Sequence, residues 1–307
     1  MDGLIAFASQ SVRLATPILL AALGAIFCYR SGVLNIGLEG MMLTGALMGV
    51  VGSTLTGQPF IGLLAAAVAG AVMGLIFAVF AVSFLADQAV VGTALNLVSI
   101  GFTGYLFRLL MTGTGETQNV PGFGAMPIPG LERIPILGPI VFNQNIFVYI
   151  CLVAVVLLQV LLYHTGFGLN MRATGENPRA ASAMGVNVFA LRYEAVIASG
   201  LLAGLGGAAL SIGALNLFIE QMSAGRGFIA LAAVTFGRYD PIGTLLASLV
   251  FGAADALQLR LQVASTGIPY QYIQMLPYVV TLVVLAVVKG KARAPKSTGV
   301  RFEREAL

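Results

Sequence analysis

Polar and small residues recur along one apolar segment of this sequence at the spacing of a helix face. Gln88, Gly92, Asn96, Ser99 and Thr103 are separated by 4, 4, 3 and 4 residues. Side chains three or four residues apart share one side of a helix. Amides and hydroxyls in that register can replace the water around a polar solute, which an apolar wall would not do. We expect this side to face protein or a cavity, and a solute pathway is the sharper hypothesis.

A second polar cluster lies in the stretch SGVLNIG and just after it. Asn35 and Glu39 are four residues apart, and Gly32 and Gly37 indicate an interrupted helix. Glu39 follows Arg30 by about 13 Å of helix, near the middle of the membrane, where an acid costs about 2.5–3.5 kcal/mol. Two interpretations stay open. The pair lines a solute path, or it makes an internal hydrogen bond that fixes the broken helix.

Residues for catalysis are missing from the sequence. His164 is the single histidine, so neither a histidine metal cluster nor a Ser–His pair can form. The sequence also lacks G-x-S-x-G and the ATP-binding pattern G-x-x-x-x-G-K-[ST]. We therefore expect no catalytic site, metal or cofactor, and ATP, if it drives this protein, binds to another subunit. Asp255 and the nearby Arg260 are interpreted as an interfacial pair.

The composition identifies the solvent. Hydrophobic residues make up 58% of the 307 residues and charged residues only 9%, whereas soluble proteins carry about 25% charged residues. Lipid must surround most of this chain. Six of the 16 basic residues follow Val288, and a basic tail after an apolar helix favours a cytoplasmic flank over a nucleic-acid site.

The elements that position the polar residues are apolar segments near the length of about 20 residues that crosses a membrane. The predicted spans are Leu14–Tyr29, Leu38–Val51, Ile61–Leu85, Ala89–Met111, Ile146–Tyr163, Tyr193–Ile212, Ile242–Leu257 and Ile273–Val288. Phe228–Phe236 is too short to cross alone and follows the glycine-rich Ser223–Gly227, which indicates part of a broken or re-entrant element. Small residues at every fourth position predict close helix packing: Gly62, Ala66, Gly70 and Gly74 in one span, Gly200 and Gly204 in another.

Loop charges predict the orientation. With the tail inside and the Phe228 segment counted as a crossing, 11 basic residues lie inside and five outside, as the positive-inside rule requires. The chain is then a single membrane domain, residues 1–307, with an external loop 112–142, a cytoplasmic segment 166–190 and a basic cytoplasmic tail 289–307. Within segment 166–190, Asn177 as N-cap and Pro178 at the first helical position predict a short helix, which Gly185 ends.

Four segments in order carry a family resemblance: SGVLNIGLEGMMLTGA (31–46), ADQAVVGTALN (86–96), GENPRAASAMGV (175–186) and GRGFIALAAVTFGRYDPIGTLLASLVFG (225–252). They resemble ABC-importer permeases of the branched-chain amino acid and simple-sugar superfamily. Within it, LNIGLEGMM is most similar to the shorter of the two paired nucleoside and simple-sugar permeases.

The resemblance implies an all-α polytopic bundle of eight to ten helices with inverted halves and one broken element in each. It also implies that segment 175–185 is a coupling helix that docks on the ATPase. The matching positions are Gly175, Asn177, Ala180, Ala181 and Gly185, with Glu176 and Pro178 between them.

The function that follows is alternating-access transport of a nucleoside across a bacterial cytoplasmic membrane. The expected partners are a second permease subunit in a heterodimer, a cytoplasmic ATP-binding subunit, an external substrate-binding protein or lipoprotein, and membrane lipid, with no nucleic acid. The alternatives are a permease for a ribose- or galactose-like sugar and, from another class, a stand-alone secondary transporter or channel.

Overall fold

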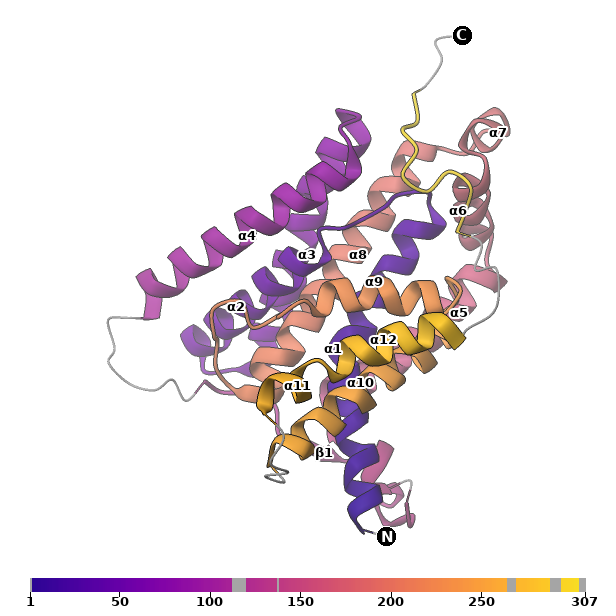
Figure 1. The fold of residues 1–307 in the computed structure, drawn as a ribbon. Coiled ribbons are helices and arrows are strands. Elements are labelled where there is room, and N and C mark those ends of the chain that lie inside the picture. The colour runs from indigo at the N-terminus through magenta and orange to yellow at the C-terminus, as the bar shows by residue number, and fades with distance from the viewer. Residues whose placement is uncertain (1, 112–119, 137, 264–268, 288–293, 304–307) are drawn as a thin grey trace.

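The computed structural model describes residues 2–111, 120–136, 138–263, 269–287 and 294–303, and it is a bundle of helices (Figure 1). Seven described helices are long and apolar enough to cross a membrane. They are α1 (Asp2–Arg30), α2 (Leu38–Thr56), α3 (Pro59–Ala78), α4 (Gln88–Met111), α5 (Ile146–His164), α8 (Val188–Leu210) and α10 (Pro241–Val263). One π-helical turn, η1 (Val79–Ser83), extends α3, and another, η4 (Ser211–Leu215), extends α8. The first seven predicted spans are therefore confirmed as helices, although α1 begins earlier than expected.

Shorter helices complete the bundle: α6 (Gly166–Glu176), α7 (Pro178–Ala183), α9 (Arg226–Phe236), α11 (Tyr270–Gln274) and α12 (Leu276–Val287). The prediction of one continuous span over Ile273–Val288 is wrong, because the helix breaks at Met275. Pro277 is the second residue of α12 and has no N–H for the preceding turn, so a helix cannot run through it undisturbed. Val288 lies outside the described residues.

Two long helices form the antiparallel centre of the fold. The start of α8 lies beside the end of α1, where Arg192 Nε donates to the Ser31 carbonyl oxygen at 3.3 Å. Further along, Gly206 of α8 packs on the Pro17 carbonyl oxygen of α1. In the most apolar 18-residue stretch of each helix, 78% of the residues are buried in α1, α2 and α8, but only 28–33% are buried in α3, α4, α5 and α10. The helices α3, α4, α5 and α10 therefore surround α1, α2 and α8.

The chain repeats one arrangement on this antiparallel pair. After α1, the irregular segment 31–37 leads into α2, which begins inside the bundle, and α3 and α4 follow. After α8, segment 216–225 leads into α9, which also begins inside, and α10 and the α11–α12 pair follow. Because α1 and α8 are antiparallel, the two halves are inverted, as the resemblance implies.

Small residues allow the close crossing of α3 and α8. A Cβ atom on Gly70 would overlap the Gly200 carbonyl oxygen, and one on Gly204 would overlap that of Ala66. The predicted small-residue faces therefore pack against each other.

The loops gather at the two ends of the bundle (Figure 1). At the N-terminal end, Arg13 Nε donates to Gln144 Oε1 at 2.7 Å. Gln144 belongs to β2 (Asn143–Asn145), which pairs antiparallel with β1 (Ala125–Pro127). The short helices η2 (Leu131–Arg133) and η3 (Gly138–Phe142) lie between these strands.

At the other end, α6 and α7 lie with the tail, where the Ser297 amide donates to the Gly175 carbonyl oxygen at 2.9 Å. Residues 112–119, 137, 289–293 and 304–307 of the predicted loop and tail lie outside the described residues. The two sets of segments therefore lie at opposite ends of the bundle (Figure 1), while the assignment of either end to the cytoplasm is part of the proposal below.

Candidate translocation site

The polar side of α4 packs against the start of α2 and the segment before it. All five residues of the predicted stripe are buried. At its N-terminal end, Gln88 Oε1 accepts the Leu34 amide at 2.7 Å. Along the same side, a Cβ atom on Gly92 would come within 3.0 Å of Ile36. The sequence predicts that this side of the helix faces either protein or a cavity. At Gln88 and Gly92 it faces protein.

Asn96 fixes the point at which α2 begins. Its Oδ1 atom accepts the Gly40 amide at 2.8 Å, and its Nδ2 atom donates to the Ile36 carbonyl oxygen at 3.1 Å. The first N–H groups of a helix have no partner within the helix. Asn96 satisfies one of them in a buried position and holds the chain just before the helix at the same time.

Asn35 ties the same segment to α8. Its Nδ2 atom donates to Ser199 Oγ at 3.2 Å, and its Oδ1 atom accepts the Gly37 amide at 3.0 Å. Asn35 and Ser199 are fully buried. Neither side chain can hydrogen-bond to bulk water, so these bonds supply the partners that their polar atoms need.

Glu39 joins the two helices that begin inside the bundle. Its Oε1 atom accepts the Gly225 amide at 2.8 Å, and its Oε2 atom accepts the Gly227 amide at 2.7 Å. These amides belong to the start of α9, where the helix dipole favours negative charge. These two hydrogen bonds explain why an acidic side chain, Glu39, is buried here. The internal hydrogen bond that the sequence left open is present, whereas contact of Asn35 or Glu39 with a solute stays a prediction.

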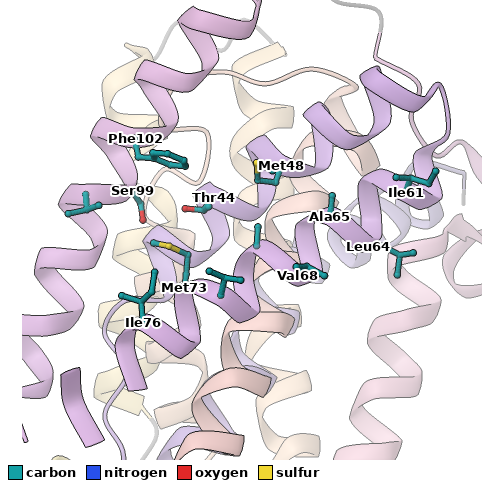
Figure 2. A pocket seen from close by; sticks show the side chains of 13 residues that line it. Thr44, Met48, Ile61, Leu64, Ala65, Val68, Met73, Ile76, Ser99 and Phe102 are labelled. Carbon is teal, nitrogen blue, oxygen red and sulfur yellow. The ribbon is translucent and has the colours of Figure 1, made fainter. Parts of the chain in front are cut away.

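Ser99 and Thr103 lie further along the stripe. Thr103 Oγ1 donates to the Ser99 carbonyl oxygen at 2.7 Å, whereas the buried Ser99 hydroxyl has no hydrogen-bond partner among the described residues. It borders a cavity of about 730 Å³ between α2, α3 and α4, and Figure 2 shows it pointing toward the Thr44 hydroxyl. The other lining residues are apolar. Leu64 and Val68 are each 62% exposed, so this cavity opens on the outer surface.

A second cavity, of about 310 Å³, lies in the other half between α9, α10 and the α11–α12 pair. Arg226, Asp255, Gln258 and Gln274 border it. The expected pairing of Asp255 with Arg260 is wrong. The Asp255 carboxylate lies 4.0 Å from Arg226 Nη2, and the Arg260 guanidinium lies over the Phe7 ring. Spacing along α10 could not identify Arg226 as the partner, because Arg226 belongs to the preceding helix, α9.

The predicted coupling segment forms the capped helix that its sequence indicates. Asn177 Oδ1 accepts the Ala180 amide at 3.1 Å, Pro178 is the first residue of α7, and Gly185 follows the helix with φ +86°. Glu176 and Ala180 are exposed, whereas Gly175 and Ala181 are buried. The helix α6 before it was not predicted. Its N-cap Thr165, whose hydroxyl accepts the Gly168 amide at 3.1 Å, is the sequence signal for it.

Residues 7–285 match the protein family described as "Branched-chain amino acid transport system / permease component". The chain belongs to this permease family. Because seven apolar helices of membrane-spanning length occur among the described residues, it is a multi-pass membrane protein.

Two similar proteins are nucleoside permeases. The permease is 42% identical to the guanosine ABC transporter permease protein NupQ of Bacillus subtilis (strain 168), over 94% of this chain and 93% of that protein. It is 37% identical to the nucleoside ABC transporter permease protein NupC of Lactococcus lactis subsp. cremoris (strain MG1363), with the same coverage of both chains.

A sugar permease and a solved structure are also similar. The putative glucose ABC transporter permease protein TsgC13 of Haloferax volcanii is 37% identical over 85% of this chain and 79% of that protein. A chain of PsaBC from Streptococcus pneumoniae in complex with Fab has a TM-score of 0.52 at 15% identity, covering 92% of this permease and 91% of that chain. That likeness concerns the fold alone.

Proposed function

We propose that this permease moves nucleosides across the cytoplasmic membrane as a subunit of an ATP-driven importer. The observation that carries the proposal is the 42% identity to a guanosine permease over 94% of the chain. The similarity to a glucose permease covers 85%, so a simple sugar is the second candidate.

The two inverted halves support alternating access. The helices α2 and α9 begin at one point inside the bundle, where Glu39 of the first accepts amides of the second. A rearrangement of one half against the other would open this point to either side of the membrane. We propose that Asn35, Glu39, Gln88 and Asn96 border the path by holding these helix starts, and that Ser99 and Thr103 continue it along α4.

The coupling segment distinguishes this proposal from a stand-alone transporter or channel. In the proposal, α7 docks on a cytoplasmic ATPase, because it is a short capped helix at the end of the bundle with Ala180 and Met184 exposed. That ATPase binds the ATP, and this chain needs no cofactor of its own. A channel would have no use for such a surface.

A second permease and an external binding protein complete the proposed importer. Bacillus subtilis (strain 168), which has NupQ, also has the guanosine ABC transporter permease protein NupP, 26% identical to this chain over 94% of it. Two guanosine permease proteins that differ in their similarity to this chain occur in one organism. This favours a transporter in which two different permease subunits form a heterodimer. The binding protein supplies the affinity, so the path needs only weak polar contacts that let the solute leave.

Uptake by whole cells tests the function. A strain that lacks only this gene should lose uptake of labelled guanosine, adenosine or uridine, and the gene on a plasmid should restore it. Labelled ribose and glucose are measured in parallel. Loss of sugar uptake with unchanged nucleoside uptake would establish the second candidate instead.

A further inference from the structure

The two halves of the permease form cavities at equivalent places but with opposite chemistry. In each half, the cavity lies between the helix that begins inside the bundle, the long helix after it and the last helix of that half. The cavity of the first half is lined almost entirely by apolar side chains. Four of the seven residues that border its counterpart in the second half are charged or carry an amide, namely Arg226, Asp255, Gln258 and Gln274; the other three are apolar. Contact with lipid tails would account for the apolar lining of the first cavity, but not for the charged residues of the second.

The charged residues lie inside the helix bundle. Asp255 is 14 residues after Pro241, the first residue of the 23-residue α10, so it is about 21 Å along that helix, one turn beyond Gly252, which packs on Ser11 and Ala15 of α1. Arg226 is the first residue of α9, next to the amides that Glu39 accepts. Their side chains are only 24% and 14% exposed. Ionisable side chains inside a membrane bundle mark solute or ion pathways more often than they support the fold.

The pair is too loosely made to be explained by stability. Its closest atoms, Arg226 Nη2 and Asp255 Oδ2, are 4.0 Å apart, whereas a hydrogen bond from nitrogen to oxygen measures about 2.7–3.2 Å. Arg226 Nη1 reaches the Met222 and Ser223 carbonyl oxygens only at 3.4 Å. Arg226 Nε is buried and has no partner among the described residues. The guanidinium and the carboxylate therefore keep hydrogen-bonding capacity for a guest.

We propose that this cavity is a transient binding site for the transported solute and that it recognises vicinal hydroxyls; the inference rests on the proposed function. Two neighbouring hydroxyls can donate to the Asp255 carboxylate and accept from the Arg226 guanidinium. The amides of Gln258 and Gln274 can pair with a base edge or with further hydroxyls. One cation and one anion side by side favour a neutral solute, because an ion of either sign would meet a like charge. The volume of about 310 Å³ is at the lower end of the range for small-molecule sites.

Variants in the complete transporter test the site. Asp255→Asn and Gln258→Leu should each lower ribonucleoside uptake at least tenfold at equal membrane abundance, with the affinity of the binding protein unchanged. Gln159→Leu is the matched control, because this residue of α5 is also half-buried in a span and lies outside the cavity. It should transport at the wild-type rate. Wild-type uptake by Asp255→Asn and Gln258→Leu would overturn the proposal.

Analogues distinguish a contact with solute from a structural role. At solute concentrations that saturate the binding protein, wild-type transporter should carry a ribonucleoside faster than its 2′,3′-dideoxy form, and Asp255→Asn should lose that difference in rate. An equal loss of both activities would mean that the pair only supports the fold. If the protein proves to carry sugars, the same comparison is made with ribose and deoxyribose, so failure of the proposed function leaves this inference testable.

Thiol labelling gives a readout that needs no substrate. Both native cysteines, Cys28 and Cys151, are buried, so the background is low. A small hydrophilic reagent should label Gln258→Cys in the assembled transporter, with protection by ribonucleoside. It should not label Leu97→Cys, whose side chain is 66% exposed on the outer surface of α4 and would lie in lipid. An unreactive Gln258→Cys would show that no wet path passes this cavity.

Discussion

Glu39 Oε2 accepts the Gly227 amide at 2.7 Å, and this bond joins the start of α2 to the start of α9. The contact is close along the backbone as well, since a Cβ atom on Gly227 would come within 2.6 Å of the Glu39 Cα atom. One carboxylate thus connects the two inverted halves at their centre. Any movement of one half against the other has to move or break this connection.

The first prediction concerns the strength of that connection. Glu39→Leu leaves the Gly225 and Gly227 amides without acceptors in a buried position, and each such group costs about 1–3 kcal/mol. We expect a clear loss of thermal stability of the purified permease complex and loss of transport. Glu39→Gln keeps one acceptor and should have a milder effect. Glu220→Gln is the control, because Glu220 makes an exposed pair with Arg108, which contributes little. Equal melting temperatures for Glu39→Leu and wild type would contradict the connection.

The second prediction concerns Asn96. Asn96→Leu removes partners from the Gly40 amide and the Ile36 carbonyl oxygen, so we expect severely slowed transport together with reduced stability. Binding-protein affinity should not change. Ser99→Ala separates the two effects, because the Ser99 hydroxyl has no partner among the described residues and its removal should leave the melting temperature unchanged. If Asn96→Leu transports at the wild-type rate, the α4 stripe is a packing face and the path lies elsewhere.

The third prediction separates two neighbouring alanines of α7. Ala180 is exposed, whereas Ala181 is packed against Val188 and Phe302. Ala180→Glu should abolish ATP-dependent uptake by blocking the docked surface, without affecting insertion or melting temperature. Ala181→Glu should abolish uptake by disrupting the packing, with increased proteolysis of segment 166–190. Normal uptake by Ala180→Glu at equal membrane abundance would disprove the docking assignment.

Local sequence signals predicted the elements well, because each depends on neighbouring residues. Seven of the eight apolar segments predicted as spans are long helices among the described residues, and Asn177 with Pro178 predicted the start of α7. Asp87, which precedes α4, is of a residue type that favours the N-cap position, and its Oδ1 atom accepts the Ala89 and Val90 amides. The break before α12 was missed because hydropathy outweighed Pro277.

The contacts that build the site were not predictable in the same way. The Glu39 carboxylate and the Gly227 amide are 188 residues apart, and the partner of Asp255 lies on another helix. Register along α4 predicted which residues share a buried side, but it could not say whether that side faces a cavity or a backbone. That depends on the path of segment 31–37, which tertiary packing fixes.

The fourth prediction concerns orientation. Cysteines are placed at exposed positions of the two opposite ends, Met126→Cys in β1 and Lys296→Cys in the tail. An impermeant reagent should label the first in intact cells and the second only after lysis. Two other positions in the same segments are less suitable for labelling. Ser297 is buried and bonded to Gly175, and Thr117 lies outside the described residues. Labelling of both cysteines in intact cells would overturn the orientation that the loop charges predict.

The fifth prediction concerns the tail, which is built into the coupling end of the bundle. The Gly299 amide donates to the Gly32 carbonyl oxygen at 3.1 Å, and Arg192 Nη1 donates to the Val300 carbonyl oxygen at 3.1 Å. Beyond these bonds, the Phe302 ring packs against Phe189, with 5.5 Å between ring centroids, and contacts the cluster that includes Ala181 of α7. The tail therefore holds α7 against α8.

Removal of that ring should loosen α7 while leaving the membrane helices in place. Phe302→Ala deletes a buried aromatic side chain, a change that costs about 3–5 kcal/mol in a well-packed core. Here it should destabilise the packing of α7 and the tail rather than that of the membrane helices. We expect faster cleavage by trypsin after Arg179 and lower uptake, with the melting temperature of the helical bundle nearly unchanged. Val300→Ala is the control, because the Val300 side chain is 52% exposed and its backbone bond to Arg192 survives the change. Equal cleavage rates for Phe302→Ala and Val300→Ala would show that the tail does not hold α7.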